Sequence, residues 1–178
     1  AMEKQKMRTA STIISLSVIL ACLSISAQQT SAQAAEVEIV QTLDVRYASI
    51  EGVDPKFLSL DICSPKGAKG APVVVFVHGG YWKAGDKSQK GHLPTFFCGR
   101  GFVFVTINYR LAPAAKHPAI IQDVARAVAW VHDHIARRGG DPAQIFLTGH
   151  SAGAHLVALL GTDAKRLGDL GKPLSILR

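Results

Sequence analysis

The stretch Gly149-His150-Ser151-Ala152-Gly153 decides the fold, and the sequence on either side of it shows why. A short, mostly apolar run at 144–148 precedes it, and an apolar run of helical length follows at 154–160. A strand, a Gly-x-Ser-x-Gly turn and a helix in this order are typical of a serine raised on a sharp bend. Glycines suit both sides of that bend, because a Cβ atom there would crowd the strained backbone. The pattern indicates Ser151 as a candidate nucleophile.

Strands and helices alternate through the rest of this half of the chain. Residues 73–77 are an uninterrupted run of valine and phenylalanine, which is typical of a parallel strand buried on both faces. The remaining expected elements are a helix at 88–98, a strand at 102–107, a helix at 119–138, a strand at 145–148 and a helix at 151–160. Repeated strand–helix units predict an α/β fold with a mostly parallel sheet, helices on both faces and right-handed crossovers.

Two further strands are expected ahead of this unit. Residues 37–47 and 57–63 place apolar side chains at alternate positions, and a Gly- and Pro-containing turn at 51–55 separates them. They predict two antiparallel strands, each with one buried face.

The first 34 residues have the composition of a secretory signal peptide. Basic residues precede an uncharged, mostly apolar run at 12–27, and Ala32-Gln33-Ala34 offers a cleavage pattern of small residues. We therefore expect a signal peptide at 1–34, one domain at 35–178 and a secreted or periplasmic location. A membrane anchor is the first alternative, although serines interrupt the run and a span needs roughly 20 apolar residues. Lipoprotein processing at Cys22, which would tether the same domain to a membrane, is the second.

Composition narrows the classes of partner. The chain has 178 residues, of which 48% are hydrophobic, so it suits one globular domain. Its net charge of +7 is scattered without a basic block, so no nucleic acid is expected as a partner. Export would permit a disulfide between Cys63 and Cys98. Spacings typical of zinc ligands are absent from the sequence, and we expect neither a metal nor a cofactor.

A second motif, His78-Gly79-Gly80-Tyr81-Trp82, follows the apolar strand at 73–77. Ligands of open α/β sheets bind beyond the carboxyl ends of the strands, where this loop and the serine turn would meet. Acyl transfer through a serine creates an oxyanion that needs backbone N–H donors, and consecutive glycines allow close approach. We assign Gly79, Gly80 and Ala152 as these donors.

Together with Asn108-Tyr109-Arg110-Leu111-Ala112-Pro113, the two motifs resemble the α/β-hydrolase esterases and lipases over residues 37–160. The Tyr-Trp pair after the glycines is most similar to the branch of kynurenine formamidase-like enzymes and feruloyl or acetyl esterase-like carboxylesterases. The resemblance implies an N-terminal half of an α/β-hydrolase fold, with Ser151 as nucleophile and the three donors at an oxyanion hole. It also implies that residues 108–113 are a structural loop and that His78 shapes the oxyanion loop.

The triad order of this fold is serine, then Asp or Glu, then histidine. His155 lies one helical turn after Ser151, along the helix rather than over the hydroxyl, and His150 points away by its place in the turn. We therefore expect the triad acid and histidine beyond residue 178 and consider the domain incomplete at its C-terminal end.

Two functional hypotheses follow. The first is a serine hydrolase of carboxylic esters, with aryl formamides as a second substrate class, acting on small-molecule esters or amides through an acyl-enzyme on Ser151. Tyr81 and Trp82 are its candidate substrate-binding residues. The alternative is a catalytically inactive hydrolase-like fragment or binding module. In both cases the 178-residue chain alone is expected to be weakly active or inactive, because it lacks an activating base.

Overall fold

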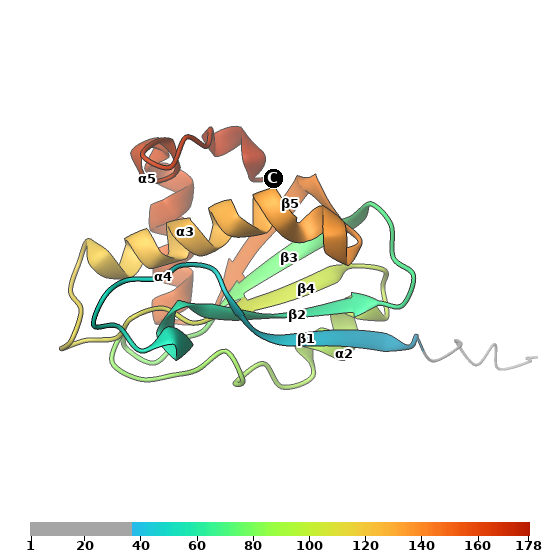
Figure 1. Ribbon diagram of the computed structural model, residues 1–178, viewed down its shortest axis with the longest axis horizontal. Coiled ribbons are helices and arrows are strands. Elements are labelled where there is room, and N and C mark those ends of the chain that lie inside the picture. The colour runs from blue at the N-terminus through green and yellow to red at the C-terminus, as the bar shows by residue number, and fades with distance from the viewer. Residues whose placement is uncertain (1–36) are drawn as a thin grey trace, which may run out of the picture. The chain divides into compact units, whose positions relative to one another are not determined.

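The structure is a computed structural model that describes residues 37–178 (Figure 1). The predicted signal peptide at 1–34 and the lipid site at Cys22 lie outside the described residues. The elements in chain order are β1 (Ile39–Arg46), η1 (Pro55–Leu58), β2 (Ser59–Pro65), β3 (Ala71–Val77), α2 (Leu93–Cys98), β4 (Val103–Ile107), α3 (Ala119–His134), η2 (Ile135–Arg138), β5 (Gly140–Gly149), α4 (Ala152–Thr162), α5 (Ala164–Gly168) and η3 (Leu174–Ile176).

Five strands form one mixed sheet in the order β1-β2-β4-β3-β5 (Figure 1). β4, β3 and β5 run parallel to one another, as buried apolar strands linked by helices should. β2 runs antiparallel to both β1 and β4 and so extends the parallel part at one edge. The predicted α/β fold, a mostly parallel sheet led by two antiparallel strands, is confirmed.

The leading strands differ from the prediction in their start and burial. Residues 57 and 58 belong to the 3-10 turn η1, where the Asp54 side chain accepts a hydrogen bond from the Lys56 N–H at 2.9 Å, so β2 begins at Ser59. β2 is buried on both faces because it lies between β1 and β4 with packed groups above and below. The prediction of one buried face was therefore wrong for β2.

The larger core lies between the sheet and helices α3 and α4. The apolar stripe predicted for residues 119–138 is buried there, and Leu156 and Leu160 of α4 join the same cluster. The helix is α-helical only to His134 and then tightens into η2, which ends at Gly139 in a left-handed conformation (φ 85°). The stripe residues are Ile120, Val124, Val128, Val131 and Ile135.

A smaller core on the opposite face is covered by α2, which confirms helices on both faces of the sheet. Its buried members are Cys63, Val74, Phe76, Cys98 and Phe104. Both cysteines are free thiols, so the disulfide that export would permit is not formed here. The predicted helix at 88–98 begins only at Leu93, because the preceding turns anchor the chain to the sheet through Lys87.

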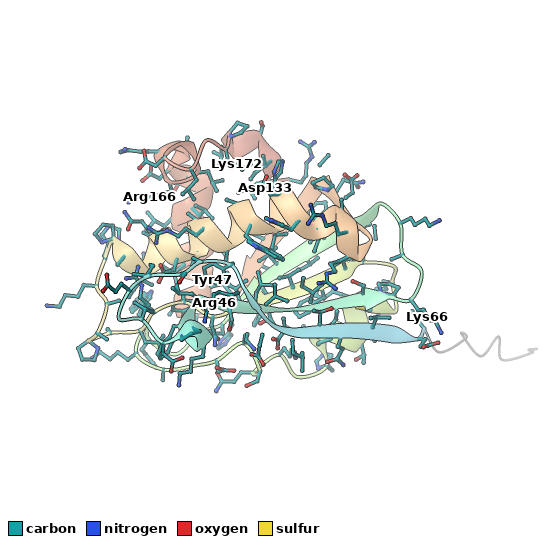
Figure 2. All side chains as sticks on the ribbon, in the orientation of Figure 1. Arg46, Tyr47, Lys66, Asp133, Arg166 and Lys172 are labelled. Carbon is teal, nitrogen blue, oxygen red and sulfur yellow. The ribbon has the colours of Figure 1, made fainter. Side chains whose placement is uncertain are left out.

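The final segment returns to the outer edge of the sheet. β5 is longer than the predicted strand at 145–148, and Leu177 forms a parallel bridge with Ile145 on its free side. Lys172 and Asp133 of α3 lie close together in Figure 2, and their side chains form an ion pair at 2.5 Å. In residues 37–178, no helix is long and apolar enough to cross a membrane.

Candidate active site

Ser151 lies at the sharp turn between β5 and α4, with its side chain exposed. Its backbone has φ 52° and ψ −117°, a conformation that a residue with a Cβ atom rarely adopts. Hydrogen bonds fix the turn, since the His150 N–H donates to the Val77 carbonyl at 3.1 Å and the Gly153 N–H to the His150 carbonyl at 2.9 Å. The predicted elbow is therefore present and held by the neighbouring strand β3.

The two glycines of the elbow are required by packing. A Cβ atom on Gly149 would lie 2.6 Å from the backbone carbon of Gly153, and a Cβ on Gly153 would overlap the carbonyl of Val77. Carbon atoms in contact lie about 3.5–4.0 Å apart, so neither position accepts a side chain without backbone movement. These contacts give the glycine spacing its physical reason.

The glycine loop after β3 lies directly against the elbow. β3 and β5 are parallel neighbours with Val77 opposite Gly149, so the residues that follow each strand emerge side by side. A Cβ atom on Gly79 would lie 2.8 Å from the His150 carbonyl oxygen and 3.2 Å from the Ser151 Cβ. The two predicted motifs therefore meet in one place.

Three N–H groups at this junction have no backbone partner. Within the described part of the chain, no backbone carbonyl accepts a hydrogen bond from the N–H of Gly79, Gly80 or Ala152. Gly79 contacts the elbow directly, and Ala152 follows the serine as the first residue of α4. First-turn N–H groups of a helix lack intrahelical acceptors and favour negative charge. The junction can thus offer donors to an anion that forms beside Ser151.

His78 contacts the glycine loop through its buried ring. Its ring is buried, stacks on the Tyr109 ring with 4.3 Å between centroids, and has Nδ1 2.7 Å from the Gly79 carbonyl oxygen. The Tyr109 hydroxyl donates to the His78 carbonyl at 2.8 Å. Burial lowers the pKa of His78 and raises the pKa of Tyr109 to about 12, which keeps both groups neutral near pH 7. These contacts fix the position of the backbone at His78 and Gly79, next to Ser151.

Tyr81 and Trp82 form the outer rim of the loop. Gly80, Tyr81 and Trp82 have successive φ values of 114°, 54° and 60°, a left-handed turn that costs about 1–2 kcal/mol at each residue with a Cβ. Tyr81 is 79% exposed and Trp82 is 37% exposed, and the Trp82 ring meets the His155 ring edge-on at 5.4 Å. Two aromatic side chains thus border the elbow and remain open to solvent.

Side chains of the segment after β4 bond to the glycine loop's continuation and to α3. Arg110 forms a two-point ion pair with the fully buried Asp123 of α3, with N–O distances of 2.7 and 2.8 Å. The Asn108 side chain bonds to the loop at Asp86 and Lys87. Residues 108–113 therefore serve as the structural loop that the resemblance implies.

The sequence analysis missed the buried charges around Lys87 and Asp61. Their side chains form an ion pair at 2.6 Å although they are 26 residues apart. Asp61 stands in an alternating strand pattern, where a charged residue usually faces water. The burial of Asp61 could be predicted only by knowing which strands lie beside β2, because the pattern of one strand does not identify its neighbours.

In residues 37–178, no side chain forms a hydrogen bond with the Ser151 hydroxyl. The histidine side-chain hydrogen bonds found there involve His78, His132 and His134, and none reaches the Ser151 hydroxyl. His155 is instead placed against Trp82. No group of three or more His, Cys, Asp or Glu side chains that could hold a metal is found in the same residues.

A mostly parallel sheet, a strained serine between a strand and a helix, and an adjoining glycine loop define an α/β-hydrolase. Residues 60–172 match the family BD-FAE. The match spans more than half of the chain, and the chain belongs to this family of α/β-hydrolase esterases.

Individual relatives agree with that assignment. The chain is 45% identical over 95 residues to "Esterase LipQ" of Mycobacterium tuberculosis, which covers 53% of this chain and 23% of the relative. It is 35% identical over 128 residues to "Kynurenine formamidase" of Danio rerio, with 70% and 41% covered. Among solved structures, Esterase B from Lactobacillus rhamnosis is similar with a TM-score of 0.64 and 26% identity over 91% of this chain and 53% of that one. The chain thus spans about a quarter to a half of these relatives.

Proposed function

We propose that the protein is a serine hydrolase of carboxylic esters that forms an acyl-enzyme on Ser151. The observation that carries the proposal is the contact between the two loops, in which Gly79 packs against the Ser151 Cβ. A nucleophile and unengaged N–H donors side by side are the two parts that acyl transfer requires of a serine site. The relatives named as esterases support the same activity.

In the proposed reaction, Ser151 Oγ attacks the ester carbonyl carbon and forms a C–O bond while a base takes its proton. The carbonyl oxygen becomes an oxyanion, which the N–H groups of Gly79, Gly80 and Ala152 stabilise. The bond to the alcohol then breaks, the alcohol leaves with the proton, and water hydrolyses the acyl-enzyme. One oxyanion donor contributes about 10²- to 10³-fold in kcat in enzymes of this kind.

The acid and histidine of the triad are proposed to lie beyond residue 178. Chain order in this fold supports this, because the acid and the histidine follow the serine. In the described residues, neither the His150 nor the His155 side chain hydrogen-bonds to the Ser151 hydroxyl. His155 donates only its backbone N–H to the Ser151 carbonyl, at 3.1 Å, and its ring contacts Trp82. Without a base, the serine hydroxyl is a weak nucleophile at neutral pH. The 178-residue chain alone is therefore expected to turn over ester at or near the buffer rate.

The substrate is proposed to carry an aryl or acyl group that packs against Tyr81 and Trp82. Their exposure and strained backbone support this role, because strain is retained where a site needs a fixed geometry. A kynurenine formamidase among the relatives makes aryl formamides a second substrate class. Replacing Trp82 by alanine should then raise KM for phenyl acetate more than for ethyl acetate, and an equal change for both esters would argue against the aromatic contact.

The experiment is hydrolysis of p-nitrophenyl acetate by the full-length protein and its Ser151→Ala variant. We expect the variant to lose at least about 10³-fold in kcat, because the covalent route is closed. Ser175→Ala, which removes an exposed hydroxyl in η3, is the matched control and should retain full activity. Equal turnover by the wild type and the Ser151→Ala variant would refute the proposal.

A further inference from the structure

The glycine loop is held in an unfavourable shape and needs an anchor. Gly80, Tyr81 and Trp82 form a left-handed turn, closed by hydrogen bonds from the N–H groups of Lys83 and Ala84 to the Gly80 carbonyl, both at 2.9 Å. Such conformations persist only where surrounding contacts over-determine them. Tyr81 is largely exposed and cannot supply those contacts itself.

One anchor is a buried lysine seven residues after Gly80. Lys87 Nζ lies 2.6 Å from Asp61 Oδ1 and 2.7 Å from Asp44 Oδ1, and Lys90 Nζ lies 2.9 Å from Asp61 Oδ2. Asp61 belongs to the middle of β2, and both Asp61 and Lys87 are buried. Asp44 reaches the cluster from an irregularity in β1, where its own N–H also donates to Asp61 at 3.0 Å. The loop is thus tied to two strands.

The main chain of Lys87 is fixed as firmly as its side chain. Its N–H donates to Asn108 Oδ1 at 2.6 Å, and its carbonyl accepts from the Thr106 hydroxyl at 3.1 Å. Thr106 is the cross-strand partner of Asp61, so neighbouring side chains on β2 and β4 hold both ends of the same residue. Asn108 also donates to Asp86 at 2.9 Å.

Stability alone does not explain this cluster. A buried ion pair contributes little net stability compared with apolar groups of the same volume, because desolvation offsets the attraction. Burial acts against charge on both groups, yet the hydrogen bonds outweigh it, so the pKa of Asp61 is lowered and the pKa of Lys87 is raised. Both side chains stay charged near neutral pH, and the ion pair between Lys87 and Asp61 fixes the distance and direction between the loop and β2.

We infer that Lys87, held by Asp61 and Thr106, is a positioning residue that keeps Gly79 and Gly80 aligned as oxyanion donors. The inference rests on the proposed function. Lys87 acts through the loop and does not touch the substrate. Displacing donors by about 1 Å can lower a rate about 100-fold, so an intact anchor should matter for kcat more than for binding.

The test compares Lys87→Met with the wild-type full-length protein. We expect kcat for p-nitrophenyl acetate to fall about 10- to 100-fold with KM changed less than about 3-fold. Amide hydrogen exchange at Lys83 and Ala84, whose N–H groups donate to the Gly80 carbonyl, should become at least about 10-fold faster. Lys87→Arg, which keeps the charge, should recover part of the lost kcat.

Thr106→Val is a second variant that keeps the volume of the side chain and removes only the tie to the Lys87 carbonyl. It should lower kcat about 3- to 10-fold and speed the same exchange. Val128→Ala, on the buried face of α3, is the control for a loss of stability. Lys66→Met, which breaks an exposed ion pair with Glu38, is the control for the loss of a lysine charge outside the Lys87 cluster. Both controls should leave kcat and loop exchange unchanged.

Unchanged exchange in both Lys87→Met and Thr106→Val would overturn the inference, as would equal losses of kcat in Lys87→Met and Val128→Ala. Failure of the proposed function is a different result, in which the wild type shows no Ser151-dependent turnover. The exchange measurement decides on the anchor in that case too, because it does not depend on catalysis.

Discussion

At the scale of single residues, backbone contacts explain the two motifs better than side chains do. Ser151 is strained, and the strain is tolerated because glycines let the neighbouring backbones approach. Gly153 packs against the Val77 carbonyl, whereas Gly161 in the same helix has nothing within 4 Å of an added Cβ. The same substitution should therefore have opposite effects at these two positions.

Gly153→Ala should lower the free energy of unfolding by about 2–3 kcal/mol, because its Cβ would force the elbow away from β3. Gly161→Ala should raise it by about 0.5 kcal/mol, because alanine has the higher helix propensity and meets no neighbour. Urea unfolding of both variants measures the two changes. Equal effects in the two variants would contradict the packing account.

A second prediction at this scale concerns acid stability. Burial would raise the pKa of Asp86, but hydrogen bonds from Ser88 and Asn108 outweigh it and lower the pKa to about 2. An unfolded aspartate has a pKa of about 3.9, so its contribution is complete above that value and is lost as the pH falls from about 4 to about 2.

Urea midpoints measured from pH 5 to pH 2 should therefore fall more steeply for the wild type than for Asp86→Asn. Glu51→Gln, which removes an exposed carboxylate in the turn before η1, serves as the comparison and should give the same slope as the wild type. Parallel curves for the wild type and Asp86→Asn would show that Asp86 does not take part in acid unfolding.

At the scale of elements, the hydrophobic periodicity predicted a helix correctly where contacts with distant segments did not change its ends. The stripe of α3 is confirmed because one helix face meets one sheet face. The helix expected at 88–98 begins only at Leu93, because Lys87 forms hydrogen bonds with β2 and β4 and holds the preceding segment on the sheet. Contacts between residues far apart in the sequence cannot be derived from a local pattern.

The packing of α2 on β2 predicts the behaviour of the two thiols. Burial raises the pKa of Cys63 and raises the pKa of Cys98 to about 11, so both remain protonated at pH 8. Iodoacetamide should alkylate neither cysteine in the folded protein and both after unfolding in urea. Mass spectrometry of peptides containing Cys63 and Cys98 measures this, and rapid labelling of the native protein would contradict the packing of α2.

At the scale of the whole molecule, the sequence predicted the class of fold and placed both loops at the carboxyl ends of strands, and the structure adds which strands are neighbours. Val77 and Gly149 end parallel neighbouring strands, so His78 to Gly80 and Ser151 had to emerge together. The anchor at Asp61 and Lys87 could not be predicted, because it depends on which strands become neighbours.

Covalent labelling of the protein is the decisive test of whether Ser151 is the nucleophile. A fluorophosphonate probe reacts with an activated serine and leaves a stable adduct, which tandem mass spectrometry can locate. In the full-length protein we expect one adduct, on Ser151, and none in the Ser151→Ala variant. Equal labelling of the two proteins, or an adduct on another serine, would contradict the assignment.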